Sequence, residues 1–337
     1  MNILMLMLSD NPDTGGMEKH ARELSSELAR LGHTVTLAAA SQHLSDLEPA
    51  VKARALDTGG SRNSPFLLLT VLRLIRANGF DVIHAQGTKA AFVLQRLTPF
   101  TRSLMRVATI HGFKSRYPKA AAFHQLIAVS QALATDIAQP GVTVIYNGVS
   151  VIPQAPALLP KETERPVWLA VGRLVSVKGF DFLIRTFQYC PGTLLIAGDG
   201  PERQRLADLI SSTHQSETVK LLGFRSDVPA LMAAADGVVI SSEREGFSYV
   251  CAEALLLGKP VISTDVPIAN EILPEKHIFR GEDPKRFAAY LSQDTSTLVA
   301  EQAEAQAFAA DQLSLSSMAS QTLNVYQRAI ANLVSIH

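Results

Sequence analysis

Residues 167–179 read VWLAVGRLVSVKG, and this stretch decides the fold. Its first five residues are apolar, which is typical of a strand buried on both faces, and Gly172 ends the run. Apolar strands are also predicted at 193–198, 219–223, 237–241 and 260–264, with helical stretches between them. Because strands alternate with helices, we expect a parallel sheet with right-handed crossovers.

The first half of the chain has the same design. Strands are predicted at 3–8, 34–39, 81–85, 108–110, 126–129 and 143–146, and amphipathic helices at about 17–31 and 66–77. Residues 150–166 contain four prolines and no hydrophobic period, which indicates a linker. The stretch from about Ser314 to Leu333 reads as one amphipathic helix.

These patterns predict an α/β protein with two doubly wound, Rossmann-like domains that face each other across a cleft. A chain of 337 residues is long enough for two domains. The expected boundaries are 1–150 for the first domain, 151–166 for the linker, 167–313 for the second domain and 314–337 for a helix that packs back on the first. Doubly wound sheets bind ligands at the carboxyl ends of their strands.

The composition excludes disordered and fibrous classes, since 47% of the residues are hydrophobic and 18% are charged. Cys190 and Cys251 are the two cysteines, and their spacing suits neither a metal site nor a disulfide framework. The opening MNILMLML reads as a buried strand, and no run reaches the ~18 apolar residues of a membrane span. We expect a cytoplasmic protein, at most peripheral on the inner face of the cytoplasmic membrane.

Charge is unevenly distributed along a chain of zero net charge. Residues 1–150 have 15 Lys and Arg against 10 Asp and Glu, and from Arg62 to Lys119 ten basic residues accompany one acid, Asp81. Single cations usually lie on solvated helix faces, but such a run predicts a surface for lipid head groups or an acidic lipid-linked glycan. The residues expected on this membrane or acceptor surface are Arg96, Arg102, Arg106, Lys114, Arg116 and Lys119.

Two glycine-containing loops are candidate anion sites. Thr14-Gly15-Gly16-Met17 lies between the first strand and helix, where backbone N–H groups and the helix N-terminus attract anions. Alone this motif is weak, because a Gly-Gly turn is more often structural. In the second loop, Arg173 and Lys178 follow Gly172, and two such cations can neutralise a diphosphate. A solvated loop with two chance cations is the alternative.

The third candidate is the segment Glu245-Gly-Phe-Ser-Tyr-Val-Cys-Ala-Glu253, which follows a predicted strand and opens a helix. Two carboxylates beside an anion-binding helix terminus are unfavourable for stability unless a ligand uses them. A carboxylate accepts two hydroxyl hydrogen bonds, as from vicinal sugar hydroxyls. The backbone amides of Gly246, Phe247, Ser248 and Tyr249 would face the same ligand.

Two common motifs are missing. The sequence has no Asp-x-Asp, the usual carboxylate clamp for a metal-bound diphosphate, so we expect no metal and no cofactor. It also has no Gly-x-Gly-x-x-Gly: Gly198-Asp-Gly200-Pro-Glu-Arg203 comes nearest, but Pro201 and Arg203 break the dinucleotide fingerprint. A nicotinamide dehydrogenase is therefore disfavoured, and nothing indicates nucleic acid as a partner.

Taken in order, several segments resemble the retaining GT-B glycosyltransferases of family 4, which include lipopolysaccharide-core and lipid-linked-glycan transferases. The resemblance covers about residues 1–280. The segments are GGMEKHARELSSELARLGHTV, TIHG, IAVS, VIYNGV, VGRLVSVKG, LLIAGDGPER, LLGFRSDVPALMAAAD, EGFSYVCAEAL and GKPVIST.

The resemblance implies a role for each matching residue. Arg173 and Lys178 grip the donor diphosphate, Glu245 binds hydroxyls of the donor sugar, and Glu253 binds ribose hydroxyls. His111 supports charge in the transition state, although a lone histidine at a strand end is more often structural. The remaining donor-binding residues are Gly15, Gly16, Gly172, Phe224, Arg225, Gly246, Phe247, Ser248 and Tyr249.

The implied function is transfer of a hexose or N-acetylhexosamine from a nucleotide-diphosphate sugar, UDP favoured over GDP, to a glycan or lipid-linked acceptor in cell-surface polysaccharide or lipopolysaccharide synthesis. Ser248 departs from the pattern, which commonly has glycine there. Two alternatives stay open: a nucleotide-sugar 2-epimerase, and a non-catalytic nucleotide-binding subunit of a glycan-assembly complex. The non-catalytic subunit would be expected to have lost Lys178 or Glu245, and both are present.

Overall fold

The structure is a computed structural model that describes the chain except for residues 12–14, 46 and 335–337. The chain divides into two compact units. The first unit comprises Met1–Gly148 together with Gln312–His337, and the second comprises Val149–Asp311. The C-terminal segment of the chain therefore belongs to the same unit as the N-terminal half.

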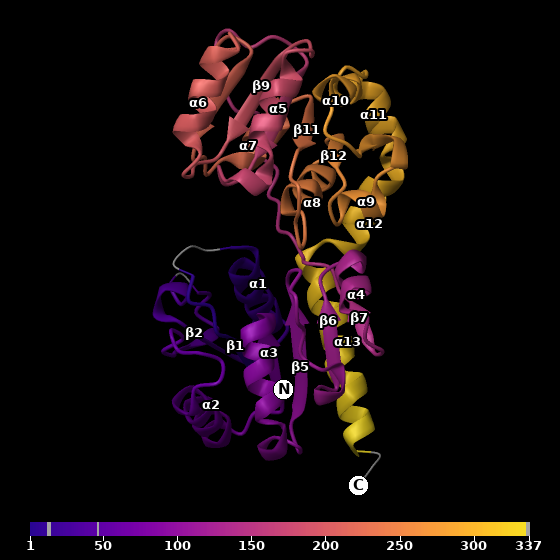
Figure 1. Ribbon diagram of the computed structural model, residues 1–337. Coiled ribbons are helices and arrows are strands. Elements are labelled where there is room, and N and C mark those ends of the chain that lie inside the picture. Colours follow the sequence, from indigo (N-terminus) through magenta and orange to yellow (C-terminus); the bar gives the residue numbers. More distant parts are fainter. Residues whose placement is uncertain (12–14, 46, 335–337) are drawn as a thin grey trace. The chain divides into compact units, whose positions relative to one another are not determined.

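The first unit is built on a seven-stranded parallel sheet in the order β3-β2-β1-β4-β5-β6-β7 (Figure 1). Strand β1 pairs with both β2 and β4, so the strand order reverses between β1 and β4. The strands are β1 (Asn2–Met7), β2 (Thr34–Ala39), β3 (Val51–Ala55), β4 (Val82–Gln86), β5 (Met105–Ile110), β6 (Gln125–Ala128) and β7 (Val142–Val144). The helices are α1 (Gly16–Arg30), α2 (Pro65–Asn78), α3 (Gly87–Arg96), α4 (Gln131–Ile137) and α13 (Leu315–Val334).

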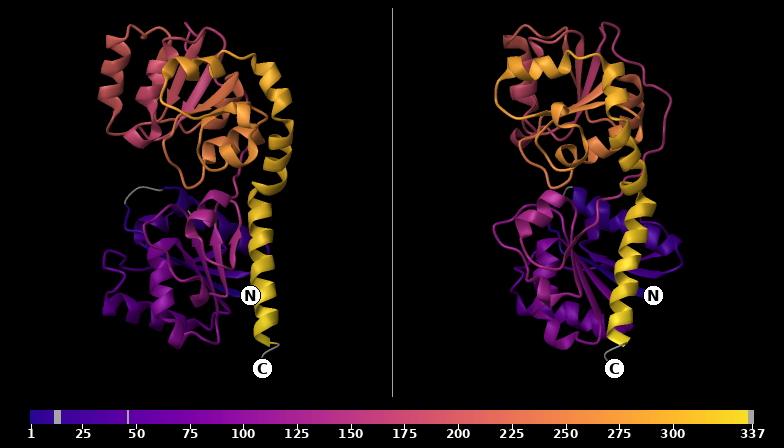
Figure 2. Two further views of the ribbon diagram at one scale, coloured as in Figure 1. Left: turned by 45° about the vertical axis from the view of Figure 1, so that its right-hand side comes forward. Right: turned by 90° about the vertical axis from the view of Figure 1, so that its right-hand side faces the viewer.

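Helix α13 packs against α1 and β5 of the first unit (Figure 2). Tyr326 is fully buried in this contact, and its hydroxyl lies 2.6 Å from Nδ1 of His84. Gly148 permits a close backbone approach, because a Cβ there would lie 2.7 Å from Cα of Leu315. The C-terminal helix thus contributes to the core of the first unit.

The second unit has a six-stranded parallel sheet in the order β10-β9-β8-β11-β12-β13, with the reversal between β8 and β11. The strands are β8 (Val167–Val171), β9 (Thr193–Ala197), β10 (Val219–Gly223), β11 (Gly237–Ile240), β12 (Val261–Thr264) and β13 (Ile278–Phe279). The helices are α5 (Phe180–Phe187), α6 (Arg203–Ser212), α7 (Val228–Ala234), α8 (Tyr249–Leu256), α9 (Ala269–Ile272), α10 (Pro284–Leu291), α11 (Thr295–Glu301) and α12 (Ala303–Gln312).

The predicted fold class, two doubly wound α/β sheets, is confirmed, and every predicted strand is present to within three residues of its observed ends. Sequence patterning missed β3 and β13. Strand β3 lies at the sheet edge with four of its five residues exposed, so it lacks the apolar run that marks an internal strand. Within the described residues, no helix is long and apolar enough to cross a membrane.

Candidate functional site

The loop after β8 is anchored to the end of β9 and to the residue Asp199 beyond it, on both sides of the first predicted cation. Gly172 donates from its backbone N–H to the carbonyl of Ala197 at 3.0 Å, and Leu174 donates to the carbonyl of Asp199 at 2.9 Å. Arg173 lies between these two anchored residues. Its backbone position is therefore set by the sheet, at the carboxyl end where doubly wound folds bind ligands.

Gly179 brings the end of this loop against the loop that follows β11. Its φ is +63°, and a Cβ would lie 2.1 Å from the carbonyl oxygen of Ser241. Two hydrogen bonds reinforce the approach: Ser241 Oγ donates to the carbonyl of Lys178 at 2.9 Å, and the N–H of Glu243 donates to that of Val177 at 2.9 Å. Only glycine allows this combination of dihedral angle and contact.

Lys178 and Glu245 meet across the point where the strand order of the second unit reverses. Lys178 Nζ donates to Glu245 Oε1 at 2.9 Å, and Ser242 Oγ donates to the same oxygen at 2.6 Å. The Lys178 side chain is 25% exposed and that of Glu245 is 10% exposed. Because an ammonium has three donors and a carboxylate two oxygens, both groups keep capacity for a ligand while paired.

The residues after Glu245 lead into the N-terminus of α8, with Ser248 as its N-cap. Phe247 is buried and makes an edge contact with the ring of Tyr249 at 5.0 Å. Ser248 is fully buried, and its hydroxyl has no hydrogen-bond partner among the described residues. The amides of 246–249 therefore open the helix beside the Lys178–Glu245 pair, where the helix dipole favours an anion.

The other predicted donor residues of the second unit lie on α8 and on the loop that follows β10. Glu253 is the fifth residue of α8 and is half-buried. Phe224, which follows β10, is 79% exposed and presents a free aromatic surface. Arg225 forms two hydrogen bonds with Asp227, from Nε at 2.7 Å and from Nη2 at 2.6 Å. A base-edge contact from Arg225 would have to share or replace this bond.

In the first unit, the Gly15 amide of the Gly-Gly loop already binds a side chain of the helix that follows it. The Gly15 N–H donates to Glu18 Oε2 at 3.0 Å, and Ser9 Oγ donates to Glu18 Oε1 at 2.5 Å. Glu18 is buried. Gly16 is the first residue of α1, and Thr14 lies outside the described residues. An anion at the Gly15 amide would therefore compete with the Glu18 carboxylate.

His111 follows β5 and lies within a group of histidines. Its Nε2 is 2.8 Å from Gln86 Oε1, and its ring meets that of His20 edge-on at 4.6 Å. Burial, with smaller contributions from His20 and His84, holds the pKa of His111 well below its usual range. Since an amide oxygen only accepts, the neutral ring donates from Nε2 and has its lone pair on Nδ1.

The predicted basic surface needs one correction. Arg106 lies within β5 and is 8% exposed, and its guanidinium donates to the carbonyls of Thr101 at 2.6 Å, Leu104 at 3.2 Å and Ala122 at 3.1 Å. The basic stretch of sequence gave no sign that this arginine satisfies backbone acceptors inside the unit. The others are exposed: Arg96, Arg102, Lys114, Arg116 and Lys119.

Sequence reasoning missed Ser242 and Lys89. Ser242 orients Glu245, and a serine three residues before the carboxylate was the available signal. Lys89, in the first turn of α3, donates to the carbonyl of Thr58 at 2.6 Å. It was not predicted as a site residue because α3 was not predicted as a helix.

The described residues contain no group of three or more His, Cys, Asp or Glu side chains that could hold a metal ion.

The second unit thus has a lysine–carboxylate pair at a strand-order reversal, beside a helix N-terminus, on one of two doubly wound sheets. A cation and a helix N-terminus suit phosphate groups, and a carboxylate suits hydroxyl groups, so the arrangement fits a ligand that carries both. Residues 14–151 match the family model for glycosyltransferase family 4, and residues 152–296 match that for glycosyl transferases group 1. The chain belongs to the group 1/family 4 glycosyltransferases, as its sequence predicted.

Individual relatives agree with the family. The lipopolysaccharide core biosynthesis glycosyltransferase LpsE of Rhizobium meliloti is 27% identical over 74% of this chain and 76% of its own. LpsD of the same bacterium is 27% identical over 57% of each chain. The crystal structure of Anabaena HepE with UDP superposes with a TM-score of 0.79 over 97% of this chain and 100% of that one, at 22% identity. At that identity the likeness shows the shared fold, which is GT-B.

Proposed function

We propose that this protein is a metal-independent, retaining glycosyltransferase that moves a hexose or N-acetylhexosamine from a UDP-sugar to a glycan or lipid-linked acceptor in the synthesis of lipopolysaccharide or another cell-surface polysaccharide. The observation that carries the proposal is the Lys178–Glu245 pair, 2.9 Å apart beside the N-terminus of α8. The UDP bound in HepE and the core-biosynthesis role in the name of LpsE support the choice of donor and process.

The cations of the site would stabilise the leaving group. As the bond between sugar and diphosphate loosens, negative charge grows on the diphosphate, and Arg173, Lys178 and the amides at the start of α8 are the groups that would bind it. Fixed donors aimed at developing charge are a large source of catalysis because they need no reorganisation during the reaction. The diphosphate would then accept the proton of the attacking hydroxyl.

The carboxylates would bind hydroxyls rather than form a covalent bond. In this proposal Glu245 accepts hydrogen bonds from the donor sugar, and Glu253 from the ribose. Ser242 and Lys178 orient Glu245 through Oε1, so Oε2 remains for the sugar. His111 would support positive charge that develops on the sugar. Gly15 and Gly16 would contact the diphosphate, which would replace the Glu18 carboxylate at the Gly15 amide. Phe224 and Arg225 contact the base.

We further propose that the first unit binds anionic membranes through its exposed cations, without insertion. The surface is formed by Arg96, Arg102, Lys114, Arg116 and Lys119, and Arg106 is excluded by its burial. A lipid-linked acceptor would lie at the membrane, where each cation near an anionic surface contributes about 1 kcal/mol.

The test combines binding and turnover. UDP at about 100 times its dissociation constant should stabilise the native state by roughly 2.7 kcal/mol, and GDP and ADP by less. Turnover of the UDP-sugar so identified should continue in excess EDTA. If chelator abolishes turnover and magnesium or manganese restores it, the metal-independent mechanism is wrong. If no nucleotide raises the melting temperature, the proposed donor class is wrong.

A further inference from the structure

The first unit has a cavity of about 480 Å³ at the carboxyl edge of its sheet. It collects residues that follow four different strands: Asp10 after β1, Arg62 after β3, Thr88 and Lys89 after β4, and Lys114 and Arg116 after β5. All of these residues belong to the first unit. Cavities of this size accommodate small ligands such as a sugar, and this edge is where doubly wound sheets bind them.

The cavity is strongly positive. Four cations line it, Arg62, Lys89, Lys114 and Arg116, against the single carboxylate of Asp10. Asp10 lies 3.5 Å from Lys89, and no other carboxylate in the described part of the chain pairs with any of the four. Like charges gathered around a concave surface repel one another and attract an anion. The arrangement is therefore unfavourable by itself and favourable with an anionic ligand.

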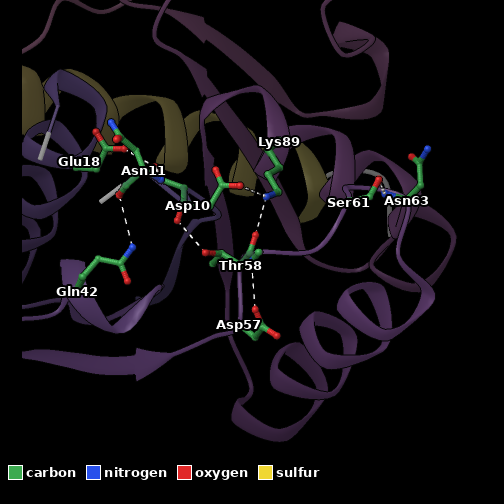
Figure 3. Close-up of polar contacts among 11 residues, drawn as sticks. Asp10, Asn11, Glu18, Gln42, Asp57, Thr58, Ser61, Asn63 and Lys89 are labelled. Carbon is green, nitrogen blue, oxygen red and sulfur yellow. Dashed lines mark hydrogen bonds and ion pairs between the residues drawn. The ribbon is translucent and has the colours of Figure 1, made fainter. Parts of the chain in front are cut away.

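Lys89 is held in place by a backbone carbonyl. Its ammonium donates to the carbonyl of Thr58 at 2.6 Å, and the Thr58 hydroxyl donates in turn to the carbonyl of Ser9 at 2.8 Å (Figure 3). Thr58 is buried, and the Lys89 side chain is 26% exposed. An ammonium has three donors, so Thr58 and Asp10 leave one for a ligand.

Arg116 and Lys114 are presented by an ordered loop. The Tyr117 hydroxyl accepts from the N–H of Lys114 at 2.9 Å and donates to Asp136 Oδ2 at 2.5 Å. Just beyond, the N–H of Lys119 donates to Gln95 Oε1 at 2.7 Å, which ties the loop to α3. A loop fixed in this way loses little conformational freedom when it binds, so its cations are pre-organised.

Arg62 is the fourth cation of the cavity, and it also lines a second cavity. Its guanidinium lies over the ring of Phe92, 4.1 Å from the centroid. The second cavity, of about 320 Å³, shares Arg62 and Arg116 with the first and adds Arg96 and Lys119. The two cavities form one basic groove, which the hydroxyls of Ser61 and Thr88 and the carboxylate of Asp10 equip for sugar hydroxyls as well.

We propose that this groove binds a phosphate group of the acceptor, so that the acceptor is a phosphorylated glycan. The inference rests on the proposed transferase function and defines the acceptor's chemical class. Arg62 and Arg116 supply planar donor pairs suited to phosphate oxygens, and Lys89 and Lys114 supply point charges. The phosphate can belong to a soluble glycan or to the head group of a lipid-linked one.

The experiment uses the full chain with UDP at saturation, so that a phosphate probe cannot enter the donor site. N-acetylglucosamine 1-phosphate and uncharged N-acetylglucosamine are titrated at constant ionic strength by calorimetry. The phosphorylated sugar should bind saturably and the uncharged sugar should not. Lys89→Gln and Arg116→Gln should each weaken binding at least about tenfold, the size of a lost charge-assisted hydrogen bond.

The matched control is Arg73→Gln, which removes an exposed cation of the same unit outside both cavities. It should bind as the wild type does. Equal weakening by Arg73→Gln, or equal binding of the two sugars, would overturn the proposal. Each variant's UDP-induced rise in melting temperature reports the donor site separately. If UDP does not raise the melting temperature of the wild type, the proposed function is contradicted. If UDP raises it normally but the phosphorylated sugar binds no better than the uncharged one, only the groove proposal is contradicted.

Vesicles identify the source of the phosphate. If phosphatidylglycerol vesicles displace the phosphorylated sugar from the wild type, and Lys89→Gln weakens both ligands, the groove takes a lipid head group. If the vesicles bind without displacing the sugar, it takes the phosphate of a glycan.

Discussion

The two units have the same strand order around their reversal points but use the carboxyl edges of their sheets differently. In the second unit the loops after β8 and β11 are joined by a charged pair, Lys178 with Glu245, and by hydrogen bonds from Ser241 and Ser242. In the first unit the Gly15 amide after β1 binds Glu18 of the same unit. Among the described residues, the four cations that line the cavity, Arg62, Lys89, Lys114 and Arg116, have no carboxylate partner other than Asp10.

This difference separates what the topology determines from what the side chains determine. The parallel sheet brings loops together at one edge in both units, and that alone predicts a ligand site in each. The second edge balances its charges and retains hydrogen-bonding capacity for a ligand with both phosphates and hydroxyls. The first edge is left positive, which suits a ligand with a negative charge of its own. The predictions below test this contrast, from the largest effect to the smallest.

The largest effect is expected at the two cations of the second unit's candidate site, Lys178 and Arg173. Lys178→Ala and Arg173→Ala should each lower turnover several hundredfold, since one contact to transition-state charge contributes about 3–4 kcal/mol. Turnover is measured under saturating donor, with circular dichroism as the test of folding. Lys161→Ala, an exposed lysine of the same unit, should be unaffected. Near-normal turnover in either variant would show that the substituted residue does not contribute to catalysis.

The second effect concerns acid sensitivity, which should be concentrated in the first unit. Burial lowers the pKa of His20 to about 4 and that of His84 to about 3, so both rings are neutral in the folded state near pH 7. The unfolded chain binds protons below its ordinary histidine pKa of about 6.5, so stability is complete above that pH and is lost as the pH falls. At pH 5 the loss should be about 2 kcal/mol for each histidine.

The second unit supplies the contrast. Its buried His277 has a carboxylate partner, with Nε2 2.9 Å from Glu301 Oε2, which partly offsets the effect of burial on its pKa. Hydrogen exchange should therefore show β4 and β5 losing more protection between pH 7 and pH 5 than β11 and β12. His20→Leu should reduce the loss of unfolding free energy between pH 7 and pH 5 by the contribution of one histidine. An unchanged loss would mean that His20 titrates normally.

The sequence predicted the fold and the second site better than the first. Buried strands such as β8 have unbroken apolar runs, and the motif of Lys178 and Glu245 lies on two short loops whose neighbours are set by strand order. Arg106 was misassigned because burial of an arginine depends on backbone carbonyls that only the folded chain brings to it. Lys89 depends on Thr58, 31 residues earlier, a pairing that no local pattern encodes.

The third prediction concerns how the loops of the second site are brought together. Gly179→Ala adds a Cβ against the Ser241 carbonyl, whereas Gly258→Ala meets nothing within 4 Å, and both glycines have positive φ, +63° and +67°. Each substitution should cost about 1–2 kcal/mol of backbone strain. Gly179→Ala should cost a further 1–3 kcal/mol or so for the clash, and should lose UDP binding. Equal melting temperatures for the two variants would show that the loops are free to separate.

The smallest effect per residue is expected at the exposed cations of the first unit. Each should contribute about 1 kcal/mol to binding an anionic surface, and the attraction fades within a Debye length of roughly 8 Å at physiological salt. No ion pair ties Arg96, Arg102 or Lys119 to a carboxylate among the residues that the structure describes.

Vesicles that contain phosphatidylglycerol or cardiolipin should therefore sediment with the protein at low salt and release it by about 0.5 M salt, whereas neutral vesicles should retain little. Charge reversal by Arg102→Glu should reduce retention, and Lys161→Glu in the second unit should not. If anionic vesicles retain no more protein than neutral ones, the membrane surface is refuted, and the basic edge of the first unit serves a soluble acceptor.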